Sequence, residues 1–210
     1  MTRILLIRHG QTEWNRERIF RGRADVPLSA EGLRQAQALA ERLATDDVAA
    51  VYTSPLVRAV ATAEHAAKPH CSQPITVDAL TDMSYGEWEG KPHERVQEQW
   101  PDLYEKWHSA PHLVRPPGGE TLSDVRQRAL EALLHITAEK SEATVVVVSH
   151  RVVCKLLLCA ALGLEDSAFW RVRQDTCCVN LLEYEHGRMA VCLLNDTCHL
   201  RGLERDTFDF

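Results

Sequence analysis

The run of residues 143–148, Ala-Thr-Val-Val-Val-Val, constrains the fold of this chain more than any other feature. It is apolar without alternating with charged residues, which is typical of a parallel strand buried on both faces. Neighbouring parallel strands are joined by crossover connections, usually helices. The run ends at Ser149, His150 and Arg151, and an apolar helical pattern begins at once. The sequence therefore predicts a central strand with polar side chains at its carboxyl end.

The first segment of the chain repeats this arrangement. Residues 3–7 are mostly apolar or β-branched and predict a buried strand, which Gly10 ends. Arg8 and His9 stand side by side where this strand stops. A guanidinium offers a fixed fork of donors that matches phosphate geometry, and an imidazole is a nucleophile or base near neutral pH.

A third strand end carries another arginine. Residues 49–53 predict a strand, and Ser54 followed by Pro55 predicts the start of a helix, with Arg58 in its first turn. In open α/β sheets, ligands bind outside the carboxyl ends of the strands. If the three strands are adjacent and parallel, the polar residues at their ends meet at one edge of the sheet.

Helical patterns alternate with strands through most of the chain. One helix is expected to begin after Ser29 and to bury Leu33, and a second, strongly amphipathic one spans residues 121–139. A hairpin is expected from residues 179–185 and 189–194. The alternation predicts an α/β fold, a three-layer α/β/α sandwich with a mainly parallel sheet, helices on both faces and an antiparallel edge.

Composition excludes several classes of protein. The net charge of −6 argues against a nucleic-acid or anionic-membrane partner, and no apolar run reaches a membrane-spanning length. The 7 cysteines form no CxxC pair, so a disulfide framework or zinc site is not expected and a cytoplasmic location is predicted. The chain has no GxxxxGK[ST] loop and no carboxylate cluster at metal-ligand spacing, so neither a metal nor another cofactor is expected.

The three strand ends bring positive charge together inside an acidic protein. This pattern predicts a site for a small anion with several oxygens, and bidentate guanidinium contacts favour phosphate. Two histidines indicate chemistry beyond binding, because one imidazole can attack phosphorus while the other donates hydrogen bonds to oxygens that gain charge. The leaving alkoxide also needs a proton donor, a carboxylic acid or a histidine, which spacing alone does not identify.

Several motifs in order resemble the histidine phosphatase superfamily, in its phosphoglycerate-mutase-like branch. They are residues 6–15 (LIRHGQTEWN), 21–29 (RGRADVPLS), 52–59 (YTSPLVRA), 86–90 (GEWEG), 117–121 (PGGET) and 148–150 (VSH). The resemblance implies that His9 is the nucleophile and becomes phosphohistidine. It also implies that Arg8, Arg58 and His150 hold the phosphoryl oxygens, with Asn15 at the rim of the pocket.

Two positions depart from the family pattern. The proton donor of this branch is a glutamate, and Asp82 holds the matching position with a shorter side chain. We expect Asp82 to be the donor, with Glu87 and Glu89 as the alternatives. Arg151 stands where the branch usually has glycine. Together with Arg21, it predicts that the substrate carries a second anionic group, such as a carboxylate or another phosphate.

The resemblance also bears on the organisation of the chain. Residues 1–203 are expected to form a single histidine-phosphatase-like domain, with Arg21 and Gly22 among its substrate-binding residues and a loose tail at 204–210. An insertion at about 84–119, rich in tryptophan and proline, is expected over the active site. It is interpreted either as a substrate-selecting segment or as a structural insertion with buried tryptophans.

The predicted function is hydrolysis of phosphomonoesters through a phosphohistidine intermediate, with small, acidic phosphorylated metabolites as substrates. Two alternatives remain at this point. One is phosphoryl transfer of the phosphoglycerate mutase type, and the other is a catalytically weakened phosphate-binding or regulatory protein. The compact chain resembles the phosphatases more than the longer mutases, and the sequence leaves a homodimer open.

Overall fold

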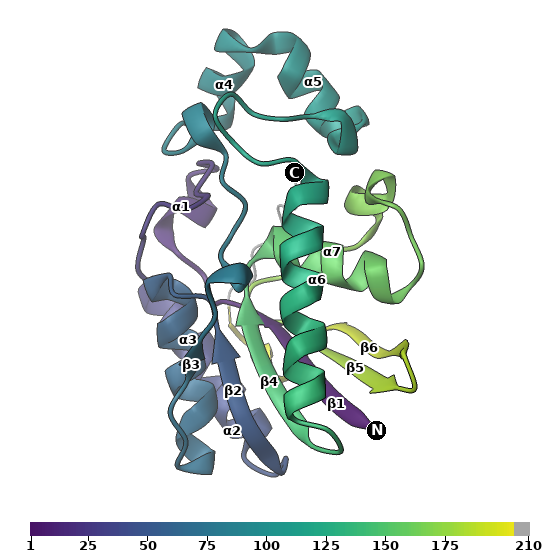
Figure 1. The fold of residues 1–210 in the computed structure, drawn as a ribbon. Coiled ribbons are helices and arrows are strands. Elements are labelled where there is room, and N and C mark those ends of the chain that lie inside the picture. Colours follow the sequence, from purple (N-terminus) through teal and green to yellow (C-terminus); the bar gives the residue numbers. More distant parts are fainter. Residues whose placement is uncertain (204–210) are drawn as a thin grey trace.

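The computed structural model describes residues 1–203 and contains a six-stranded sheet in the order β3-β2-β4-β1-β5-β6 (Figure 1). The strands are β1 (Thr2–Arg8), β2 (Val48–Thr53), β3 (Ile75–Thr76), β4 (Thr144–Ser149), β5 (Val179–Glu185) and β6 (Arg188–Asp196). Strand β4 lies between β1 and β2 and is parallel to both. Strand β5 pairs with β1 antiparallel, and β6 continues that edge. The predicted central strand and antiparallel edge are confirmed.

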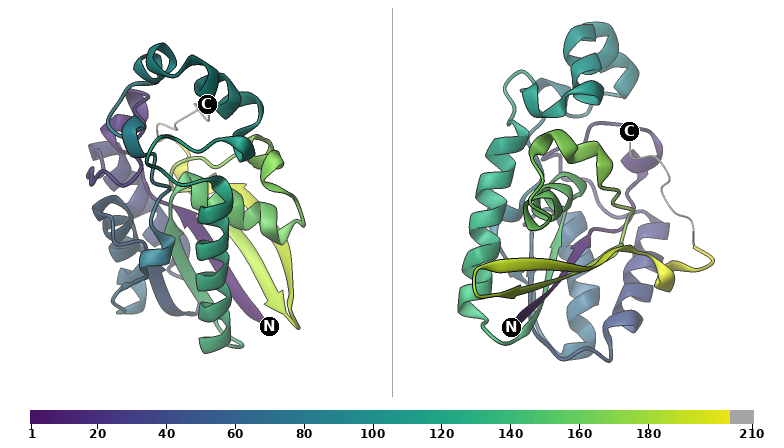
Figure 2. Two further views of the ribbon diagram at one scale, coloured as in Figure 1. Left: turned by 45° about the horizontal axis from the view of Figure 1, so that its top comes forward. Right: turned by 90° about the vertical axis from the view of Figure 1, so that its right-hand side faces the viewer.

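Helices cover both faces of this sheet. The α-helices are α1 (Glu13–Arg16), α2 (Ala30–Leu43), α3 (Val57–Ala67), α4 (His93–Gln99), α5 (Pro101–Ser109), α6 (Leu122–Glu139) and α7 (Arg151–Ala161). Short 3-10 helices are η1 (Lys68–His70), η2 (Asp78–Leu80), η3 (Gly86–Trp88), η4 (Pro111–Leu113), η5 (Asp166–Arg171) and η6 (Cys198–Leu200). Helices α2 and α3 lie on one face, and α6 and α7 lie on the other, so the three-layer fold is as predicted (Figure 2).

The alternation of side chains explains why the central strands are apolar throughout. In β4, Val145 and Val147 pack into the core under α6 and α7, whereas Val146 and Val148 pack into the core under α2 and α3. All four valines are fully buried. A strand covered on both faces has no position at which a polar side chain reaches water, and this produces a continuous run of valines.

The register of the strands brings the three polar strand ends together. Arg8 of β1 is paired with Ser149 of β4, and Thr53 of β2 is paired with Val148. One residue further, the amide of His9 donates to the carbonyl of Ser149 at 2.9 Å. The loops that follow β1, β2 and β4 therefore open at the same edge of the sheet, as predicted.

Residues 84–119 form α4, α5 and their connections beyond this edge, at the top of Figure 1. Trp88 and Trp107 of this segment are fully buried and belong to the same core as α6 and α7. The Trp107 ring lies 5.7 Å from those of Phe169 and Trp170, between ring centroids. Aromatic packing thus attaches the segment to the rest of the domain.

Two local expectations were wrong. Leu33 is 47% exposed, and Leu39 is buried on α2 in its place. Helix α3 begins at Val57 with Leu56 as its N-cap, so Ser54 is not the cap. None of the helices within the described residues is long and apolar enough to cross a membrane.

A glycine of α2 fixes the position of the loop after β1. A Cβ atom added to Gly32 would lie 2.1 Å from the carbonyl oxygen of Gln11, and one added to Gly10 would lie 2.7 Å from that of Gly32. Real Cβ atoms do not approach other atoms this closely, so both backbones need hydrogen at these positions. The first turn of α2 thereby holds the backbone next to His9.

We predict that Gly32→Ala lowers the free energy of unfolding by about 1–3 kcal/mol, because the added methyl group must displace backbone rather than a flexible side chain. Urea denaturation measures this change. Leu33→Ala, one residue further on an exposed position, is the control and should change the free energy by less than about 0.5 kcal/mol. Equal effects of the two variants would contradict the close contact.

Candidate active site

His9 lies at the end of β1 with its ring fully buried. Its Nδ1 is 2.6 Å from the carbonyl oxygen of Gly10. A carbonyl oxygen only accepts, so Nδ1 carries the proton and Nε2 keeps its lone pair. Nε2 is buried and forms no hydrogen bond with any described residue. The ring therefore presents an unused basic nitrogen to the interior of the site.

The surroundings of His9 keep its imidazole neutral. Burial lowers its pKa most, and the charges of Arg58 and Arg8 and the proximity of His150 lower it further, so that it falls well below 6.5. Both effects act in the same direction, because burial and nearby cations disfavour the imidazolium. At neutral pH the lone pair on Nε2 is available for attack on an electrophile.

Two buried arginines flank His9 and are held by backbone carbonyls. Nη1 of Arg8 donates to the carbonyl oxygen of Gln174 at 2.6 Å, and Arg58 donates to those of Ala24 and Gly22, both at 2.7 Å. Carbonyl oxygens orient a guanidinium but carry no net charge to neutralise it. The Nε atoms of both arginines are buried and have no hydrogen-bond partner within residues 1–203. The site thus holds positive charge suited to an oxyanion.

His150 precedes α7 and faces His9, with 5.1 Å between the ring centroids. Its Nε2 lies 2.7 Å from Oγ of Ser54. Burial, followed by the charges of Arg58 and Arg21, lowers the pKa of His150 well below 6.5, so this ring is also neutral. Its Nδ1 lies 3.8 Å from the carboxylate oxygen Oδ2 of Asp82, which favours the tautomer with the proton on Nδ1 and Nε2 accepting from the Ser54 hydroxyl. Nδ1 is buried and has no hydrogen-bond partner in the described chain.

Asp82 brings the carboxylate of the site. It is 4% exposed, and its Oδ2 lies 3.4 Å from Nη2 of Arg58 and 3.8 Å from Nδ1 of His150. Its Oδ1 accepts from the amide of Met83 at 3.0 Å. The shorter side chain, relative to the family's glutamate, therefore still reaches the residues around His9.

The loop that carries Asp82 is clamped by one arginine of α6. Arg128 donates to the carbonyl oxygens of Ala79 and Thr81, both at 2.7 Å, and to that of Asp82 at 3.1 Å. Glu120 holds this arginine from the other side, at 2.9 Å from Nε. The clamp fixes the backbone of the acid without touching its carboxyl group.

The two alternative acids are placed differently. Glu87 is exposed. Glu89 is half-buried, and its Oε1 accepts from the amides of Tyr85 at 2.9 Å and Arg23 at 3.2 Å. Of the three candidates, Asp82 is the one whose carboxylate lies against Arg58 and His150.

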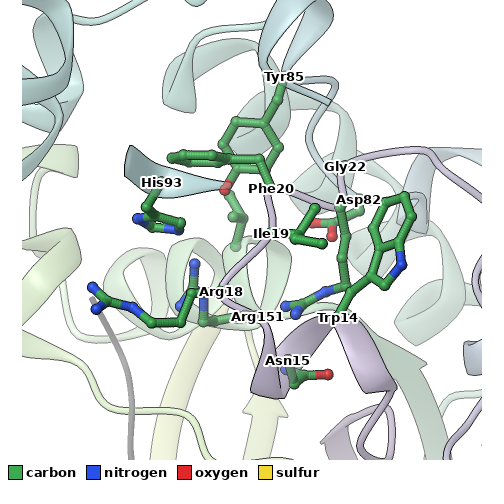
Figure 3. A pocket seen from close by; sticks show the side chains of 12 residues that line it. Trp14, Asn15, Arg18, Ile19, Phe20, Gly22, Asp82, Tyr85, His93 and Arg151 are labelled. Atoms are coloured by element: carbon green, nitrogen blue, oxygen red, sulfur yellow. The ribbon is translucent and has the colours of Figure 1, made fainter. Parts of the chain in front are cut away.

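A hollow lined in part by Asp82 is drawn in Figure 3. Asn15, Arg21, Gly22, Arg151 and Asp82 all line it, so the structure brings the predicted substrate-binding residues to one place. Trp14, Phe20, Tyr85 and His93 supply ring surfaces, and Arg18 stands at the mouth. Asn15 turns its Oδ1 toward the amide and hydroxyl of Thr12, both at 2.9 Å.

Several residues of the site escaped the sequence analysis. From the sequence Ser54 is interpreted as a helix cap, but in the structure its hydroxyl forms a hydrogen bond with His150. Gln174 accepts the hydrogen bond of Arg8 through its backbone carbonyl oxygen, so its side chain gives no indication of this role. Arg128 lies within an amphipathic helix, where the sequence pattern predicts that an arginine is exposed to solvent. His93 lies in a segment without a clear period, and burial lowers its pKa to about 3, with the charges of Arg151 and Arg18 contributing.

Comparison with known proteins places this geometry in a family. A family model described as the histidine phosphatase superfamily, branch 1, matches residues 4–197. The chain belongs to this superfamily. The resemblance seen in the motifs is confirmed over nearly the whole chain, and so is the prediction of a phosphatase-type enzyme.

Individual relatives agree with this assignment. Phosphoserine phosphatase 1 of Hydrogenobacter thermophilus is 34% identical over 200 residues, which are 95% of each chain. The structure of Bacillus stearothermophilus YhfR superimposes with a TM-score of 0.91 at 34% identity, covering 95% of this chain and 99% of that one. The phosphoserine phosphatase of Entamoeba histolytica in complex with 3-phosphoglyceric acid has a TM-score of 0.85 at 26% identity, covering 95% and 100%.

We predict that the stability of the protein falls in acid because buried histidines stay neutral. Below about pH 6.5 the unfolded chain takes up a proton at His93 that the folded chain does not bind until about pH 3, so the free energy of unfolding falls as pH falls. His93→Asn should make this slope shallower by up to about 1 kcal/mol per pH unit. Urea denaturation between pH 4 and pH 6 in acetate buffer measures it.

His186→Asn on the exposed turn between β5 and β6 is the matched control. It should leave the slope of the unfolding free energy against pH as in the wild type. A slope that His93→Asn leaves unchanged would show that His93 takes up its proton at the same pH in the folded and the unfolded protein and would contradict the account.

Proposed function

We propose that the protein hydrolyses phosphomonoesters through a phosphohistidine at His9. The observation that carries the proposal is the neutral imidazole of His9, with Nε2 unused between two arginines that carbonyl oxygens hold in place. Nε2 attacks phosphorus, the bond from phosphorus to the ester oxygen breaks, and the leaving oxygen takes the proton of the Asp82 carboxyl group. The products of this step are an alcohol and phosphohistidine.

Water completes the cycle in the proposed mechanism. It attacks the phosphorus of phosphohistidine, the carboxylate of Asp82 accepts its proton, and the nitrogen–phosphorus bond breaks. Inorganic phosphate leaves, His9 is neutral again, and Asp82 is protonated for the next turnover. Charge on the three equatorial oxygens is stabilised by Arg8, Arg58 and the Nδ1–H of His150.

The substrates we propose are small, acidic phosphorylated metabolites, with Asn15, Arg21, Gly22 and Arg151 as the substrate-binding residues. These four residues line the same hollow as Asp82, whose Oδ2 lies 3.8 Å from Nδ1 of His150. Phosphoserine phosphatase 1 of Hydrogenobacter thermophilus, by its name, acts on such a compound. Retention of both histidines, both buried arginines and a carboxylate within contact distance favours turnover over a binding protein without activity.

We further propose a single domain over residues 1–203 in which residues 84–119 help to select the substrate. Tyr85 and His93 of this segment line the hollow, while Trp88 and Trp107 anchor it in the core. The net charge of −6 supports an enzyme without a nucleic-acid or anionic-membrane partner, and the free cysteines support a cytoplasmic location. A homodimer stays open as an assembly.

The test of the proposed function is phosphate release from a panel of phosphomonoesters in the presence of a chelator. We expect release to persist with the chelator and to fall at least about 10³-fold in His9→Asn, because the nucleophile is lost. His186→Asn, on the exposed turn between β5 and β6, is the control and should keep full activity. Activity that survives in His9→Asn would contradict the proposal.

The role of Asp82 predicts a dependence on the leaving group. Asp82→Asn should lower kcat/KM about 10²–10⁴-fold for an alkyl phosphate, whose alkoxide needs a proton. It should lower kcat/KM less than about tenfold for p-nitrophenyl phosphate, whose leaving group departs as an anion. Arg128→Gln should show the same pattern more weakly, because it shifts the loop of Asp82. Equal losses for both substrates would assign Asp82 to binding alone.

A further inference from the structure

The carbonyl oxygen that orients His9 belongs to the peptide unit between Gly10 and Gln11. A trans peptide unit is planar, so its N–H and its C=O point in opposite directions and turn together. The N–H of this unit, on Gln11, donates to Oε1 of Gln35 at 3.0 Å, while its C=O lies 2.6 Å from Nδ1 of His9. The group that holds the amide of Gln11 therefore also aims the carbonyl of Gly10.

Gln35 is a polar residue on the buried face of α2. It lies beside Ala36 and Leu39 on this face and is itself fully buried. A glutamine at such a position costs folding free energy unless its amide group is hydrogen-bonded. Because a backbone amide only donates, the oxygen of the side chain faces Gln11. A polar side chain thus extends from the core to the peptide unit beside the nucleophile.

The preceding peptide unit, between His9 and Gly10, is held at both ends. Its N–H donates to Oγ1 of Thr62 at 3.1 Å, and its C=O accepts from the amide of Cys177 at 3.2 Å. In the described chain, the unit that carries the Gly10 carbonyl has only Gln35 and the His9 ring as hydrogen-bond partners. The orientation of this second unit therefore depends on Gln35.

Rotation of this unit would change the tautomer of His9. Glycine tolerates a wide range of backbone angles, so Gly10 itself does not prevent the rotation. A rotated unit would present its N–H to the ring in place of its C=O. Nδ1 would then accept, and the proton of the neutral ring would lie on Nε2. A protonated Nε2 has no lone pair with which to attack phosphorus.

We propose that Gln35 is a positioning residue of the reaction, which aims the Gly10 carbonyl oxygen at Nδ1 of His9 and so keeps the lone pair on Nε2. The proposal rests on the proposed function, in which Nε2 attacks phosphorus, and adds to it the residue that prepares the nucleophile. Gln35 is not among the residues that line the hollow, and it acts on the reaction through the backbone.

The variant Gln35→Met tests this role, because methionine keeps the length of the side chain and lacks the amide oxygen. We expect kcat/KM for p-nitrophenyl phosphate, which reports the attack of Nε2, to fall about tenfold or more. The inhibition constant of inorganic phosphate, which reports the buried arginines, should change less than about threefold. Gln37→Met, the same substitution on the exposed face of α2, is the matched control and should leave both constants unchanged.

Nitrogen NMR of the protein with ¹⁵N-labelled histidine separates the two tautomers near neutral pH, where the ring of His9 is uncharged. In Gln35→Met we expect the proton of His9 on Nε2 in most molecules. Gln35→Glu retains an oxygen acceptor on a side chain of the same length and should keep the proton on Nδ1. Thr62→Val removes a buried hydrogen bond from the preceding peptide unit, which Cys177 still holds, and should also keep the proton on Nδ1.

A measurement on the unmodified protein does not depend on the folding of any variant. Scalar coupling across the hydrogen bond should connect the amide nitrogen of Gln11 with the side-chain carbonyl carbon of Gln35. The absence of this coupling, in spectra that show the couplings of the ladder between β1 and β4, would overturn the proposal.

The outcomes separate this inference from the proposed function. A His9 ring that keeps its proton on Nδ1 in Gln35→Met overturns the inference. So does a loss of phosphate binding equal to the loss in kcat/KM, because it would show a merely structural role. Phosphate release by the wild type that requires His9 leaves the proposed function standing in both cases. If turnover does not require His9, the proposed function fails and the inference fails with it.

Discussion

The hydrogen bond from Nδ1 of His9 to the carbonyl oxygen of Gly10 is the interaction on which the chemistry of this site depends. It fixes the tautomer of a buried ring, so that Nε2 carries the lone pair and points away from its own backbone. Gly10 itself lies against the first turn of α2, where the absence of Cβ atoms at Gly10 and Gly32 lets the two backbones touch. This contact supports the backbone whose carbonyl oxygen orients the ring of His9.

Burial without neutralisation is the second constraint. Arg8 and Arg58 are almost fully buried and held by carbonyl oxygens, and one carboxylate, that of Asp82, lies in contact with Arg58. Burying charge in this way costs folding free energy, which the rest of the core has to offset. As a consequence, the hydrogen-bond donors of the site are already oriented before an anion binds, so that little reorganisation accompanies the reaction. The neutral state of both histidines follows first from their burial, which lowers the pKa of each ring most, and then from the same positive surroundings.

The sequence revealed most of the fold, because its strongest signals were physical necessities. A strand covered on both faces must be apolar, so β4 was evident from its valines, and parallel strands place their ends together, so the meeting of His9, Arg58 and His150 followed. The prediction of Asp82 as the acid depended on its matching position in the family motif, because spacing alone does not identify one carboxylate among many.

The residues of the site that the sequence did not reveal contribute through backbone atoms or through contacts between distant parts of the chain. Gln174 contributes a carbonyl oxygen, which every residue has. Arg128 reaches the loop of Asp82 from a helix 46 residues away in the chain. Ser54 precedes a proline and therefore looks like a helix N-cap in the sequence. In the structure it lies before the N-cap Leu56 and hydrogen-bonds to the ring of His150. Leu33 fits the helical period of α2 and is nevertheless exposed. The buried face of this helix runs through Gly32, Ala36, Leu39 and Leu43 instead.

The central claim, a neutral His9 with its proton on Nδ1, is tested most directly by nitrogen NMR of the protein with ¹⁵N-labelled histidine, assigned with the His9→Asn variant. The account predicts that one ring nitrogen of His9 has the chemical shift of a protonated pyrrole-type nitrogen, Nδ1, and that Nε2 has that of an unprotonated one. Both shifts should stay constant as the pH is lowered through 6.5. A signal that moves to the imidazolium value near pH 6.5, or a proton found on Nε2, would contradict it.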